Sequence, residues 1–113
     1  MAARNARRRW TERQGVLLRL EAGAQVGLGE ASPLPGYSPE TLGDAARALG
    51  ALRLDGLGDA LAGDLGSALA FADVALEAGA PPSARHALET ALLALWSRRQ
   101  GQPAWRALAP HAG

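Results

Sequence analysis

The sequence contains no cysteine and no lysine, and among its 113 residues only three Trp, one Tyr and one Phe are aromatic. The lack of cysteine excludes disulfides and thiolate metal sites, and nothing else in the sequence indicates an oxidising compartment. All 12 basic residues are arginine, and 11 acidic residues balance them to a net charge of +1. Because no strong field of one sign surrounds such a chain, we expect neither nucleic acid nor a membrane surface as a partner.

Long apolar runs are absent as well. None reaches the roughly 18 residues that a membrane-spanning helix needs. Residues 1–9 are rich in arginine, but the apolar core of a signal peptide does not follow them. An organelle transit peptide is an alternative for this segment, since it has no acidic residue, although a solvated loop is the preferred interpretation. We therefore expect a cytoplasmic protein.

The length fits one domain, 1–113, which can bury about two-thirds of the surface that its unfolded chain exposes. Two short alternating segments predict a β-hairpin over residues 15–31. In the first segment Val16, Leu18 and Leu20 point to one face, which is the period-two pattern of a half-buried strand. A second alternating run follows a turn that contains glycine.

Two glycines, Gly27 and Gly29, leave one face of the second strand bare, which suits the close approach of another backbone. A hairpin alone is marginal in water and needs a third strand or a layer of helices. Residues 1–14 carry too little apolar pattern for a good third strand. We therefore predict a loop or a partial first strand there, and helices as the covering layer.

A rigid loop is predicted at 32–38, because prolines fix the backbone of this segment. The helical part is placed at 39–108, with Ser38 as the first N-cap. Its strongest apolar stripe runs over 83–100, with Ser83 as the N-cap.

A weaker helix is expected at 65–76, whereas 53–63 is interrupted by glycine and stays ambiguous. Strands followed by helices indicate an α+β fold, with an antiparallel hairpin or small meander followed by three to four helices.

No catalytic or metal-ligating arrangement can be recognised. The Gly-Leu-Gly run at 27–29 follows a strand, but a proline-rich loop stands where a phosphate-binding helix would begin. His86 and His111 have no partner at metal-ligand spacing, and the acidic residues are scattered. Glu30 ends a strand beside the rigid loop, where we prefer stabilisation of the hairpin end over catalysis.

Arginines surround Trp10 near the N-terminus, among them Arg9 and Arg13. Their planar guanidinium groups present donors that match a carboxylate or a phosphate. One aromatic residue in a basic run is weak support for nucleic-acid binding, and a solvated loop is the default interpretation.

Residues 27–41 read G-L-G-E-A-S-P-L-P-G-Y-S-P-E-T, and residues 82–93 read P-S-A-R-H-A-L-E-T-A-L-L. Both runs resemble the N-terminal capping domain of the enolase superfamily, with o-succinylbenzoate synthase as the closest likeness. In that family the domain caps a (β/α) barrel, and two loops of the cap close over the substrate and help to select it. The matching loops are 8–14 and 31–38. The substrate-loop candidates are Arg9, Trp10, Thr11, Arg13, Pro33, Leu34, Pro35, Gly36, Tyr37 and Ser38.

The resemblance also implies what this chain lacks. The family's barrel carries the catalytic lysines and the acidic ligands of Mg²⁺, and a barrel needs about 200 residues or more. We therefore expect a fragment with no catalytic residue, metal ligand or cofactor of its own, and with the missing barrel as its partner. Mg²⁺ and a small anionic carboxylate substrate are implied only for the full-length parent, a lyase of menaquinone biosynthesis that removes water from a cyclohexadiene carboxylate bearing a succinyl arm.

Alone, the chain is predicted to be inactive, and to show self-association through exposed apolar surface or partial disorder near 1–14 and 53–63. Related family members, dipeptide epimerases and acylamino-acid racemases, share the cap, so they remain alternatives. A non-enzymatic α+β protein-interaction module is a further hypothesis. An arginine-rich nucleic-acid binder is disfavoured by the near-neutral charge.

Overall fold

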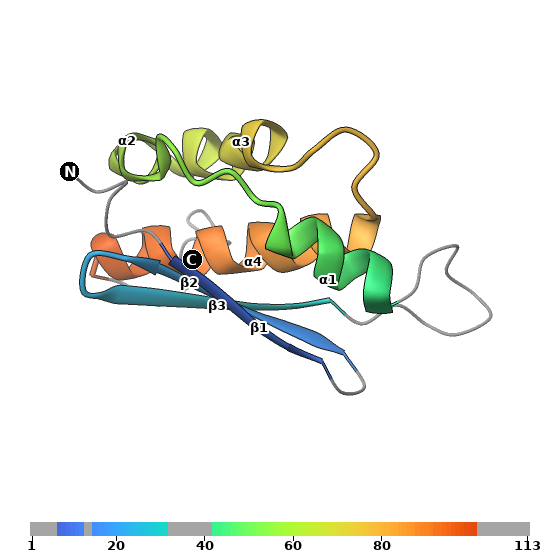
Figure 1. Ribbon diagram of the computed structural model, residues 1–113. Coiled ribbons are helices and arrows are strands. Elements are labelled where there is room, and N and C mark those ends of the chain that lie inside the picture. Colours follow the sequence, from blue (N-terminus) through green and yellow to red (C-terminus); the bar gives the residue numbers. More distant parts are fainter. Residues whose placement is uncertain (1–6, 13–14, 32–41, 102–113) are drawn as a thin grey trace, which may run out of the picture.

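The computed structural model describes residues 7–12, 15–31 and 42–101. Three antiparallel strands form one sheet in the order β1-β2-β3. Figure 1 shows α1 and α4 against one face of this sheet, with α2 and α3 on the far side of α4. The predicted α+β class is therefore confirmed, in its meander form with four helices. The elements are β1 (Arg7–Glu12), β2 (Val16–Ala22), β3 (Gln25–Ala31), α1 (Leu42–Gly50), α2 (Leu57–Ala62), α3 (Leu65–Ala75) and α4 (Pro82–Arg99).

The predicted hairpin is confirmed as β2 and β3. Val16, Leu18 and Leu20 are fully buried under the helices, whereas the residues between them lie on the opposite, more exposed face. Gly23 begins the turn with φ 61°, a left-handed conformation that glycine adopts without steric cost. Since side chains alternate between faces, the sequence period alone was sufficient to orient this strand.

A third strand, β1, corrects the expectation that the N-terminal residues lack the pattern for one. Its backbone pairs with β2 in antiparallel register, from Arg7 opposite Glu21 to Glu12 opposite Val16. An edge strand gains its pairing from backbone hydrogen bonds on one side only, and charged residues are common there because they discourage further pairing. Apolar alternation was therefore the wrong criterion for this segment.

Two helix starts also differ from expectation. The start of the first helix at Ser38 lies outside the described residues, and α1 is described from Leu42. The last helix begins one residue earlier than predicted, with Pro81 at the N-cap and Pro82 as its first residue, so Ser83 is not the cap. Proline suits the first helical position because its φ is preset and the missing N–H would have had no helical partner.

The segment 53–63, which the sequence left ambiguous, contains a short helix, α2. Leu57 and Leu61 are fully buried, and Gly56 at the N-cap has φ 86°. The glycines that obscured the helical pattern permit this sharp entry into the helix.

The core is built mainly from leucine and alanine. Phe71 is an aromatic residue buried in this core. Small residues on α4 let this helix approach its neighbours closely, which compensates for the lack of large side chains. The fully buried apolar residues of α4 are Ala84, Ala87, Leu88, Ala91, Leu92 and Leu95.

Candidate functional site

The two candidate loops are attached to the sheet at the same end. Val16, the first residue of β2, lies opposite Glu12 at the end of β1 and opposite Ala31 at the end of β3. The connection from β1 to β2 and the segment that follows β3 therefore start at the same end of the sheet. The structure thus brings together the bases of two segments that the sequence could only name separately.

The predicted site residues are divided between described and undescribed parts. Arg9, Trp10 and Thr11 lie within β1, where their Cα partners on β2 are Arg19, Leu18 and Leu17. They belong to a paired strand and not to a free loop. The remaining candidates, Arg13 and the rigid-loop residues Pro33, Leu34, Pro35, Gly36, Tyr37 and Ser38, lie outside the described residues. For all of them a contact with substrate stays a prediction.

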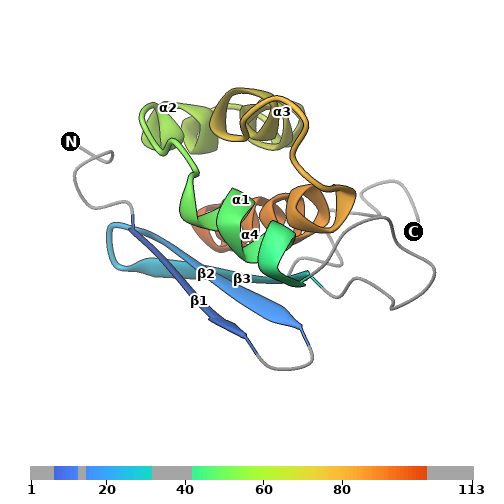
Figure 2. The same ribbon diagram turned by 45° about the vertical axis from the view of Figure 1, so that its right-hand side comes forward.

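Helix α4 supports this end of the sheet through an unusually close contact with β3. A Cβ atom placed on Gly29 would lie 1.8 Å from the carbonyl oxygen of Ala87, and one on Gly27 would lie 2.2 Å from that of Ala91. The bare face that the sequence indicated is therefore filled by helix backbone. As the residue number rises along β3 it falls along α4, so the helix starts near the end of the strand (Figure 2).

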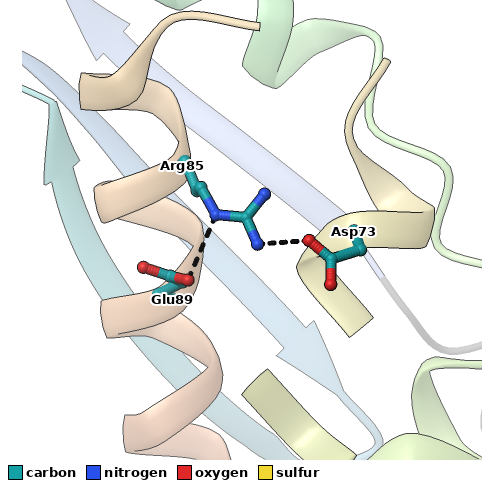
Figure 3. Close-up of polar contacts among 3 residues, drawn as sticks. All are labelled: Asp73, Arg85 and Glu89. Carbon is teal, nitrogen blue, oxygen red and sulfur yellow. Dashed lines mark hydrogen bonds and ion pairs between the residues drawn. The ribbon is translucent and has the colours of Figure 1, made fainter. Parts of the chain in front are cut away.

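The first turns of α4 are tied to α3 by charged side chains (Figure 3). The Arg85 guanidinium donates through Nη2 to Oδ1 of Asp73, and its Nε lies 3.3 Å from Oε2 of Glu89. The hydrogen bond and the negative charge of Asp73, with a smaller part from Glu89, raise the pKa of Arg85 above its ordinary value. The spacing of four residues to Glu89 was readable in the sequence, but the partner on α3 was not.

Two grooves flank the turn that connects α3 with α4. One, of about 370 Å³, also involves Asp44 and Arg47 of α1, which form an ion pair at 2.6 Å. The other, of about 430 Å³, extends toward Arg53 and Arg85. Both mix positive and negative side chains, so neither offers the single-signed surface that selects a free anion or cation. The residues shared by the two grooves are Glu77, Gly79 and Ala80.

The described residues contain no group of three or more His, Asp or Glu side chains able to hold a metal ion. His86 is exposed on α4, and Glu30 is exposed at the end of β3. Within the same residues, no helix combines the length and apolar character needed to cross a membrane.

A three-stranded meander, covered on one face by helices, defines an α+β domain in which the end of β1, the start of β2 and the end of β3 lie together. Residues 4–59, just under half of the chain, match the family model described as MenC, N-terminal domain. This match supports the capping domain of the o-succinylbenzoate synthase family. Comparison with the curated proteins and with the solved structures gave no match.

Proposed function

We propose that this chain is the substrate-specificity cap of an o-succinylbenzoate synthase-like, Mg²⁺-dependent lyase. The observation that carries the proposal is the convergence of both loop bases at Glu12, Val16 and Ala31, within the segment that the family model matches. A cap needs its selecting loops to act on one ligand, and a shared starting point at one end of the sheet supports such a role. The cytoplasmic location stays a prediction.

The division of labour follows from the residues present. Removing water from a carbon acid needs a base near the α-carbon and a cation that stabilises the developing enolate. The described residues of this chain do not fit Mg²⁺, and the chain has no lysine, so both groups would belong to the barrel. This chain would contribute recognition of the anionic substrate, with Arg9 and Arg13 as the candidate carboxylate contacts.

The activity can be tested in two steps. Purified chain with Mg²⁺ and the cyclohexadiene substrate should give no ultraviolet change from aromatisation. A separately produced barrel of an o-succinylbenzoate synthase, inactive or weakly active alone, should gain turnover when the chain is added. Turnover by the chain alone that a chelator abolishes would contradict the proposal, and so would a barrel that neither binds the chain nor gains activity.

The rigid loop supplies a sharper version of this test. In the reconstituted complex, Leu34→Ala should raise KM for the cyclohexadiene substrate, because it removes an apolar side chain with which the predicted loop would contact the ligand. Leu28→Ala, on the uncovered face of the same sheet, is the matched control and should leave KM and kcat unchanged. Equal kinetics for the two variants would remove the rigid loop from substrate recognition. Offering an N-acylated amino acid or a dipeptide in parallel tests the racemase and epimerase alternatives.

A protein-interaction module is the second candidate function, favoured by the uncovered sheet face. Leu17 and Leu28 are 42% and 48% exposed there, beside an ion pair of 3.1 Å between Arg19 and Glu21. Light scattering of the purified chain separates the candidates. The interaction module would be favoured if the chain formed a stable dimer that Leu28→Ala dissociates, and if adding the chain to the barrel gave no gain of activity.

A further inference from the structure

We infer that Gly27 and Gly29 are positioning residues, which place the base of the segment after β3 by fixing the separation between β3 and α4. The inference rests on the proposed function and deepens it, because it assigns part of the substrate selectivity to residues that touch no substrate. Its starting point is the closest backbone approach that any glycine makes in the described part of the chain.

The contact leaves no room for adjustment. Each glycine faces a helix carbonyl group, at Ala87 for Gly29 and at Ala91 for Gly27, and both carbonyls belong to the backbone of a regular helix. A flexible side chain could rotate away from an added methyl group, but a helical carbonyl cannot move without its helix. With alanine at position 29, the contact must open from 1.8 Å to at least 3.0 Å, so strand and helix must separate by more than 1 Å.

The positions of the two glycines determine which part of β3 is displaced when strand and helix separate. Gly29 lies two residues before Ala31, the last residue of β3, and Gly27 lies four residues before it. Ala31 pairs with Val16, so a shift at this end of β3 also reaches the start of β2. Displacements of about 1 Å in a substrate-positioning element are large enough to cost up to about 100-fold in rate.

The effects of alanine at the two glycine positions can therefore be compared with each other. Alanine at either position creates a similar clash with the same helix, at 1.8 and 2.2 Å, so both variants should lose stability to a similar degree. If the contact serves only packing, the kinetic effects should follow that loss. If it positions the segment after β3, the effect of Gly29→Ala on substrate should exceed that of Gly27→Ala. Gly66→Ala is the control, because its added methyl would meet only Asp64 Oδ1, at 3.6 Å.

The first readout uses the chain by itself. In amide NMR spectra, Gly29→Ala should shift the resonances of Ala31 and Ser83, which lie at the matching ends of strand and helix. Gly27→Ala should shift mainly Ala91 and Leu95 and should shift Ala31 by a smaller, still measurable amount, whereas Gly66→Ala should shift none of these resonances. Unmoved Ala31 and Ser83 resonances in folded Gly29→Ala would overturn the inference, whatever the function of the chain.

The second readout uses the chain reconstituted with the o-succinylbenzoate synthase barrel. Gly29→Ala should raise KM for the cyclohexadiene substrate about tenfold with kcat changed less than about threefold, whereas Gly27→Ala should raise KM less than about threefold. Effects that rank by melting temperature instead of distance from Ala31 would overturn the inference while leaving the proposed cap intact. An inactive wild-type complex would instead sink the proposed function, and with it the assignment to substrate selectivity.

If Gly29→Ala does not fold, the inference can still be tested with Gly27→Ala. Gly27→Ala, which has the smaller clash, must then shift the Ala31 resonance measurably and raise KM between about 1.5-fold and threefold. A folded Gly27→Ala chain with wild-type Ala31 resonance and wild-type KM would overturn the inference.

Discussion

Helix α4 makes two contacts of opposite character. Against β3 it presents backbone carbonyls to Gly27 and Gly29. Because neither glycine has a side chain, the helix backbone and the strand backbone can lie this close together. Toward α3 and the α2–α3 connection its contacts include hydrogen bonds from long side chains, with Arg85 bound to Asp73 and Trp96 Nε1 donating to the carbonyl oxygen of Gly63 at 2.9 Å. A contact between backbones has no rotamer with which to adapt, whereas a contact through long side chains does. We therefore expect the sheet side of α4 to tolerate change poorly and the α3 side to tolerate it well.

The largest effect is expected where a large side chain fills the sheet side. Leu95 is fully buried against Gly27, and Leu95→Ala should lower the free energy of unfolding by about 2–5 kcal/mol through the cavity that it leaves. Leu28→Ala removes the same atoms from the exposed face of β3 and should change the free energy of unfolding by less than about 0.5 kcal/mol. Urea titrations of both variants measure the difference, and equal losses would mean that the two faces are not distinct.

A smaller loss is expected on the α3 side. Trp96→Phe keeps an aromatic ring but removes the hydrogen bond to Gly63, which should cost about 0.5–1.5 kcal/mol. The measurement is again urea unfolding, with hydrogen exchange of the α2–α3 connection as a local readout. A loss as large as that of Leu95→Ala would place Trp96 in the core and end the contrast between the two sides.

Asp64 gives a pH-dependent effect on the same layer. Its Oδ1 accepts from the backbone N–H of Ser67 at 2.7 Å as the N-cap of α3, and this bond lowers the pKa of Asp64 below its ordinary value of 3.8. A lowered pKa stabilises the folded state above the unfolded pKa, and that contribution is lost as the pH falls through the folded value. Asp64→Asn keeps a capping oxygen but should lose this dependence below about pH 4, while Asp64→Ala should be less stable at neutral pH. Melting temperatures of the three proteins should be measured from neutral to acidic pH. If all three fell by the same amount as the pH is lowered, the prediction would be wrong.

The smallest effect is expected from the ion pairs of Arg85. Asp73 and Glu89 are exposed partners, so salt and competing water weaken their attraction. Arg85→Gln should lower the melting temperature slightly at low salt and not at all near 1 M salt, where the screening length falls to about 3 Å. A salt-independent loss would indicate packing by the arginine stem in place of charge, and Arg85→Met would then restore stability.

The sequence predicted local features with more success than contacts between distant segments. Alternation oriented β2 correctly, because each strand residue needs only its two neighbours to define a face. Prediction was poor where a residue's role is supplied by a partner far along the chain: β1 becomes a strand through pairing with β2, and α2 is stabilised by burial of Leu57 and Leu61. The candidate site divides in the same way, since the two loops could be named from the family resemblance, but the meeting of their bases at Val16 required the register.

What the sequence determined by itself about this protein is the bare face of β3, the apolar stripe of α4 and the absence of lysine, disulfides and metal-ligand spacings. Each of these is a property of residue type and period. The tertiary structure alone decided that helix backbone fills the bare face, that Arg85 pairs with Asp73, and that Glu12, Val16 and Ala31 share one end of the sheet. These depend on distances between different segments of the chain, which packing of the whole core fixes and which no local pattern encodes.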